Sequence, residues 1–127
     1  MITEDYVSFE TAKLLKEKGF DCACKVWYSE YTSQFGGEKY TSIEFDNHNK
    51  FNENYKFICS APTLQMAVKW LREVHGLFIR ITEDMTGNVF EWSVYQKNYG
   101  CKASTYVEDS YEQACEAAIK YCLENLI

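Results

Sequence analysis

The segment between Pro62 and Gly76 constrains the fold more than any other part of the chain. Proline fits the first turn of a helix, and glycine readily adopts the left-handed conformation that ends one. Between them, apolar residues recur at helical spacing and form a wide arc: Leu64, Met66, Ala67, Val68, Trp70, Leu71 and Val74. A helix with so wide an apolar surface packs on more than one side, so the pattern predicts a core helix over 62–75.

Two further segments have helical spacing. The first runs from about 8 to 18: Ser8 can cap its first turn and Gly19 can close its last. The second follows Ser110, which has Gln113 three residues later at the spacing of a capping box. One face of this last helix is marked by Tyr111, Ala114, Cys115, Ala118, Cys122 and Leu126.

Five segments alternate in polarity and are rich in β-branched and aromatic residues, which is typical of strands. They are 24–28, 40–45, 77–82, 89–96 and 101–107, and turn-forming residues such as Gly36–Gly37 separate them, while the asparagine-rich stretch 46–54 is predicted to be a loop. Strands joined by short turns pair antiparallel. The predicted class is α+β, with three helices packed on a mainly antiparallel sheet of about five strands in the order α-β-β-α-β-β-β-α.

The length predicts one domain over 1–127. A chain of 127 residues that is 46% hydrophobic buries roughly two thirds of its unfolded surface, so it can form a core without a metal or disulfide. The amino terminus lacks the basic and apolar stretches of a signal peptide, and no apolar run approaches a membrane span. We therefore expect a cytoplasmic protein with no membrane partner, whose six cysteines are free thiols.

The charge balance argues against a nucleic-acid partner. Thirteen Lys and Arg residues stand against 19 Asp and Glu residues, for a net charge of −6. Such a chain repels phosphate backbones unless its basic residues gather on one patch. The longest basic cluster, Lys13, Lys16 and Lys18, is interrupted by Leu14, Leu15 and Glu17, which is the pattern of a solvated helix face.

Cysteine and histidine spacing gives weak grounds for a metal or a catalytic thiol. Structural zinc sites usually have two close ligand pairs, and this chain has one, Cys22-x-Cys24. A thiol enzyme needs a cysteine beside a histidine that a third polar group orients, and the sequence establishes no such group. We expect no metal, no cofactor and no enzymatic activity, although a zinc site could draw on the remaining candidates: Cys59, Cys101, His48 and His75.

Aromatic residues point to a binding surface. They make up 17% of the chain and include ten tyrosines, more than a core of this size needs. If Leu77, Ile79 and Ile81 face the core, alternation places a set of aromatic and arginine side chains on the opposite sheet face. The candidate partner-binding residues are Phe78, Arg80, Tyr95 and Tyr106, with Tyr40 as a further member. The alternative is that a helix covers this face and the tyrosines belong to the core.

Three segments carry a resemblance to short hypothetical proteins of gut bacteria and their phages. They are Val7–Asp21, Ala61–His75 and Tyr111–Ile127, which together cover under half of the chain and coincide with the predicted helices. The resemblance implies a bacterial or phage cytoplasmic setting. It implies no activity, so it assigns no functional residue to this chain.

Two classes of function follow from these observations. The first is a non-enzymatic protein-interaction module, such as a phage or mobile-element accessory protein that binds a host protein or itself. Tyrosine and arginine on one face suit this role, because both bury large areas and keep a polar end for hydrogen bonds. The second is a protein that binds a small molecule or nucleotide, with aromatic residues stacked on a ligand ring.

Overall fold

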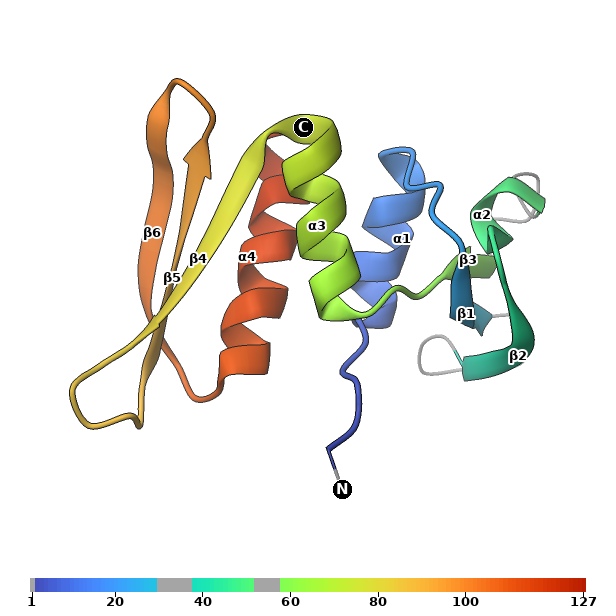
Figure 1. The fold of residues 1–127 in the computed structure, drawn as a ribbon, viewed down its shortest axis with the longest axis horizontal. Helices are drawn as coiled ribbons and strands as arrows, with labels where there is room; N and C mark the ends of the chain where they lie inside the picture. Colours follow the sequence, from blue (N-terminus) through green and yellow to red (C-terminus); the bar gives the residue numbers. More distant parts are fainter. Residues whose placement is uncertain (1, 30–37, 52–57) are drawn as a thin grey trace. The chain divides into compact units, whose positions relative to one another are not determined.

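The computed structural model describes residues 2–29, 38–51 and 58–127, with side chains omitted at 38, 43, 50, 51 and 105–107. The chain forms two compact units, Met1–Thr63 (unit 1) and Leu64–Ile127 (unit 2), shown in Figure 1. Each unit combines helices with an antiparallel sheet, which confirms the predicted α+β class. Each unit has a sheet and buried residues of its own, and a single domain over 1–127 stays a prediction.

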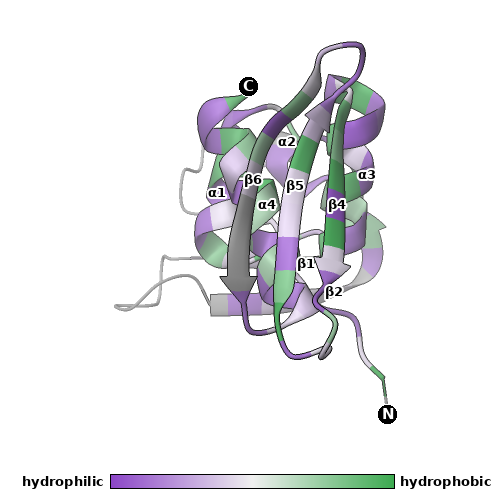
Figure 2. Ribbon diagram, turned by 90° about the vertical axis from the view of Figure 1, so that its left-hand side faces the viewer, coloured by the Kyte–Doolittle hydropathy of each residue, from purple (hydrophilic) through white to green (hydrophobic). Residues whose placement is uncertain are grey.

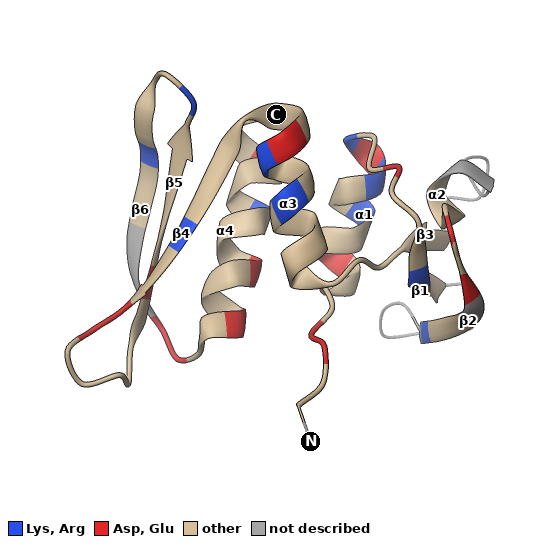
Figure 3. Cartoon of the chain, in the orientation of Figure 1, with Lys and Arg blue, Asp and Glu red and all other residues tan. Residues whose placement is uncertain are grey.

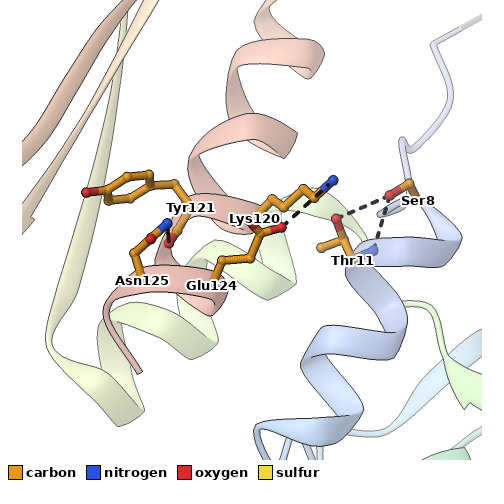
Figure 4. A network of polar contacts seen from close by, with 6 residues as sticks. All are labelled: Ser8, Thr11, Lys120, Tyr121, Glu124 and Asn125. Carbon is orange, nitrogen blue, oxygen red and sulfur yellow. Dashed lines mark hydrogen bonds and ion pairs between the residues drawn. The ribbon is translucent and has the colours of Figure 1, made fainter.

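Unit 1 begins with α1, Phe9–Glu17, and the predicted ends of this helix are confirmed. The Ser8 hydroxyl accepts a hydrogen bond from the Thr11 amide at 3.3 Å (Figure 4), which satisfies one of the amides left unpaired at a helix start. At the other end, Gly19 has φ +90°. This left-handed conformation ends the helix, and a residue with a side chain would adopt it under strain.

The described strands of unit 1 form a three-stranded antiparallel sheet in the order β2-β1-β3. β1, Cys24–Ser29, lies between β2, Glu38–Asp46, and β3, Ile58–Ser60. The β1–β2 pairing confirms the predicted hairpin, while its predicted Gly36–Gly37 turn lies outside the described residues. α1 is joined to β3 by the Lys16 Nζ, which donates to the carbonyl of Ile58 at 2.6 Å.

A short helix, α2, occupies His48–Phe51 within the stretch predicted to be a loop. Its Asn49 side chain is buried, donates to the carbonyl of Phe20 at 3.0 Å and accepts from the amide of Ser60 at 2.8 Å. These two long-range hydrogen bonds stabilise a helical turn in a segment whose asparagine-rich sequence favours a loop. The prediction of a loop over 46–54 is therefore wrong for positions 48–51.

Unit 2 begins with α3, Leu64–His75, and ends with α4, Tyr111–Asn125. Gly76, with φ +66°, closes α3 as predicted, whereas the helix starts two residues after Pro62. The Ser110 hydroxyl caps α4 by accepting from the Gln113 amide at 3.1 Å. In its last turns, Lys120 and Glu124 approach to 3.9 Å, as Figure 4 shows.

The three strands described in unit 2 form an antiparallel meander in the order β4-β5-β6. They are β4, Leu77–Glu83, β5, Phe90–Gln96, and β6, Gly100–Glu108. Both α3 and α4 pack on one face of this sheet, and Figure 2 looks onto the other face with the helices behind it. Side chains buried on the covered face include Leu77, Trp92 and Val94, in agreement with the predicted alternation.

The strands are divided between two sheets, whereas the sequence predicts one sheet of about five strands. β1 already has a partner on each side, because β3 returns to pair with it. Within unit 1, β1 is therefore paired along both of its edges, and β2 and β3 are the edge strands of that sheet. β3 has only three residues, too few for polarity to alternate visibly, which is why the sequence pattern does not reveal it.

Candidate functional site

The face of the β4–β5–β6 sheet opposite α3 and α4 is the candidate site, and we call it the outer face. Strand register fixes its membership: Phe78 pairs with Tyr95, Arg80 with Ser93, and Thr82 with Glu91. Ser104 of β6 extends the middle row, because it pairs with Ser93. Trp92 and Val94 are buried on the covered face, so their neighbours along β5 point to the outer face.

Arg80 and Tyr95 form a cation–π pair at the centre of the outer face. The guanidinium carbon lies 4.7 Å from the centre of the tyrosine ring. Beside them, Phe78 keeps 40% of its surface exposed, although it is a large apolar residue. Within the described residues, Arg80 has no carboxylate partner, so its ring contact orients the guanidinium without neutralising it.

The structure brings three of the five predicted site residues together: Phe78, Arg80 and Tyr95. α3 and α4 lie on the other face of their sheet, so the alternative in which one of these helices covers the three residues does not hold. Tyr106 belongs to β6, but its side chain lies outside the described residues. Tyr40 lies in β2 of the other sheet, opposite Trp27, and the prediction that it joins the outer face is corrected.

Tyr40 belongs instead to an aromatic cluster in unit 1. Its ring stacks on Trp27 with 4.6 Å between ring centres, and the His48 ring lies 5.9 Å from Trp27. The His48 Nε2 is 3.0 Å from the carbonyl oxygen of Cys24 and 3.3 Å from the Ser42 hydroxyl. These three rings are half-buried. The sequence pattern does not reveal this cluster, because the cluster depends on strand register and on the turn of α2.

Charge is distributed unevenly along the unit 2 sheet, as the colours in Figure 3 show. Lys97 and Lys102 flank the β5–β6 turn, and Arg80 leans toward that end over Tyr95. We call this the basic end. The opposite end, near the β4–β5 turn, is the acidic end, and it carries Glu83, Asp84, Glu91, Glu108 and Asp109.

The six cysteines are free thiols, as predicted. Burial raises the pKa of Cys24, Cys115 and Cys122 to about 12 each, so these thiols stay protonated at neutral pH. Cys101 is exposed and Cys22 is half-buried. Across residues 2–29, 38–51 and 58–127, no three histidine, cysteine, aspartate or glutamate side chains gather as a metal site would require.

No family model, curated protein or solved structure matches the chain. Among the described helices, none combines the length and the apolar character that crossing a membrane requires. The candidate site therefore rests on its own geometry, in which an arginine–tyrosine pair and an exposed phenylalanine share a sheet face opposite the unit's helices.

Proposed function

We propose that the chain is a non-enzymatic protein-interaction module that binds a protein partner through the outer face. The observation that carries this proposal is the Arg80–Tyr95 pair beside the exposed Phe78. A cytoplasmic role as an accessory protein of a phage or mobile element is the corresponding proposal for its setting. It rests on the resemblance of the three helical segments.

The composition of the outer face supports this role. Tyrosine, arginine and phenylalanine are enriched at the centres of protein interfaces, and short polar residues are typical of the rim. Here Thr82 and Ser104 lie on the two edge strands of the sheet, and Ser93 lies beside Arg80 on the central strand. Because Arg80 already lies against Tyr95, part of the entropy cost of ordering its side chain is met before a partner arrives.

Photo-cross-linking tests the proposal. A photo-reactive phenylalanine analogue at Phe78 should give a discrete protein adduct in the cells that naturally produce the chain, while the same analogue at Tyr111 should not. Tyr111 is a matched control, because it is comparably exposed but lies on α4.

Tyr95→Ala should weaken association by about 1–2 kcal/mol and leave the melting temperature nearly unchanged.

Two outcomes would count against this role. One is the absence of any adduct from position 78. The other is a large loss of stability in Tyr95→Ala with unaltered association, which would show that Tyr95 acts as a core residue and not as part of the binding surface.

The aromatic cluster of unit 1 favours a second candidate function, the binding of a nucleotide or another small molecule with an aromatic ring. Trp27 and Tyr40 are stacked and half-buried, and the exposed Lys25 lies two residues before Trp27 on β1. A planar ligand could stack on these rings while the lysine ammonium paired with a negatively charged group of the ligand.

Titration with nucleoside triphosphates should then raise the melting temperature and quench tryptophan fluorescence, and Trp27→Leu should abolish both effects. If the wild-type chain shows neither effect, this candidate is excluded.

A further inference from the structure

We infer that the outer face binds a second copy of this chain, with the basic end of each copy laid on the acidic end of the other. The inference rests on the proposed function and names its partner. Two copies related by a two-fold axis that runs across the strands present the same surface to each other with their strand directions reversed. In such a dimer, each contact between a basic end and an acidic end occurs twice.

The distribution of charge favours this reversed orientation. The chain has a net charge of −6, so two copies approaching at random repel each other. The unit 2 sheet is an exception, because Lys97 and Lys102 lie at one end, toward which the Arg80 guanidinium is directed over Tyr95, and carboxylates lie at the other. Among the strand carboxylates at the acidic end, Glu91 belongs to the outer face, whereas Glu83 and Glu108 share the register of Phe90 on the covered side. Only the reversed orientation places unlike charges opposite each other, so the charge pattern that disfavours other orientations selects this one.

Residues on the outer face itself provide the local contacts. Arg80 and Glu91 both belong to this face, and neither forms an ion pair within the described part of the chain. In the same cross-strand row as Arg80, Ser93 and Ser104 have short side chains, which permit the close approach that face-to-face sheets need. Phe78 and Tyr95 pair next to the first row of the β4–β5 ladder, toward the basic end, and add apolar surface that loses water on contact.

Charge reversal tests this orientation. In sedimentation velocity over a range of concentrations, the wild-type chain should show a reversible monomer–dimer equilibrium that rising salt weakens. Arg80→Glu and Glu91→Arg should each raise the dissociation constant about tenfold, because each places like charges together at two symmetric contacts. A mixture of the two variants should associate about as tightly as the wild type, since its pairs are again unlike. Arg72→Glu on α3 is the matched control and should associate like the wild type.

The outcomes separate this inference from the proposed function. A wild-type chain that stays monomeric, or two variants that associate no better mixed than alone, would overturn self-association in this orientation. If the analogue at Phe78 then cross-links to a different protein, the interaction role stands with another partner. If it cross-links to nothing, both proposals fail. A dimer in which Arg80→Glu has no effect would also overturn the inference, because the interface would lie elsewhere.

Discussion

The Asp84 carboxylate organises the turn between β4 and β5. Its Oδ1 accepts hydrogen bonds from the amides of Thr86, Asn88 and Val89, at 3.2, 3.2 and 3.4 Å. The Thr86 hydroxyl donates to the same oxygen at 2.8 Å. These bonds fold the residues between β4 and β5 around one side chain, as aspartate commonly does in turns. The side-chain bond from Thr86 is the largest cause of a lowered pKa at Asp84, and the three amides add to it.

We expect the Asp84 carboxyl group to titrate below its ordinary pKa of 3.8 in the folded chain. Its contribution to stability is then present above that value and is lost as the pH falls through the lower folded pKa. The carboxyl carbon chemical shift, followed by NMR as a function of pH, measures this titration directly. Thr86→Ala should move the Asp84 pKa back toward 3.8, and an unchanged pKa in that variant would contradict the assigned cause.

The thiols should differ sharply in reactivity. Cys101 is exposed and should react first with a thiol reagent at neutral pH, whereas Cys115 and Cys122 on α4 should react only as the chain unfolds. Thiol counting in denaturant without reductant should find six. A count of four or fewer in fresh protein, or rapid native labelling of Cys115, would contradict this assignment.

The buried thiols also predict a loss of stability at high pH. Their folded pKa of about 12 lies above the ordinary value of 9, so the unfolded chain releases protons first. Stability from this source is therefore complete below about pH 9 and falls between there and pH 12. Chemical denaturation of the wild type and of Cys122→Ala across that range measures the effect, and the variant should show a smaller decline.

Part of the candidate site could be predicted from the sequence. Alternation alone places Phe78, Arg80 and Tyr95 on one face, because a strand has a strict period of two. The pairing of Tyr40 with Trp27 could not be predicted, because it depends on the register between two strands. The position of His48 beside them depends on the bonds of Asn49 to Phe20 and Ser60, which join distant parts of the sequence.

Among the elements, α3 has the strongest local signal and a central place in unit 2. Trp70 and Leu71 are buried, and the Trp70 ring meets the His75 ring edge-on with 4.7 Å between centres. Gly76 marks its end in sequence and in structure alike. Elements as short as β3 and α2 have too few residues to display a period, and this is why they escape sequence analysis.

Truncating the buried side of α3 should be costly. Trp70→Ala or Leu71→Ala should each reduce the free energy of unfolding by roughly 2–5 kcal/mol, since burial is lost and a cavity remains. Lys69→Ala is the matched control, because Lys69 is exposed on the same helix and should lose little. Denaturant midpoints measure all three. If Trp70→Ala is as mild as Lys69→Ala, α3 is peripheral to the core.

Each of the two units has buried apolar residues of its own. In unit 1 these include Val7, Leu15 and Phe20, while unit 2 buries Leu71 and Val94 among others. The composition predicts enough apolar surface for a core. It does not show how that surface is divided, because division depends on which strands pair.

Hydrogen exchange should reveal the division. Leu15→Ala should speed amide exchange most in unit 1, and Leu71→Ala most in unit 2, because each removes contacts from its own core. Mass spectrometry of peptides from both units measures the two effects in one experiment. Equal acceleration throughout the chain in either variant would show that 1–127 opens as one cooperative domain.

The different strand orders of the two sheets have a consequence for folding kinetics. In unit 2, each strand meets the next one along the chain, so two successive hairpins complete the sheet with little loop-closure entropy. In unit 1, β3 must return past β2 and α2 before Trp27 can meet Ser60. Contacts between residues distant in sequence form more slowly. The amino-terminal unit, although it leaves the ribosome first, is therefore expected to complete its sheet in more time than the carboxyl-terminal one.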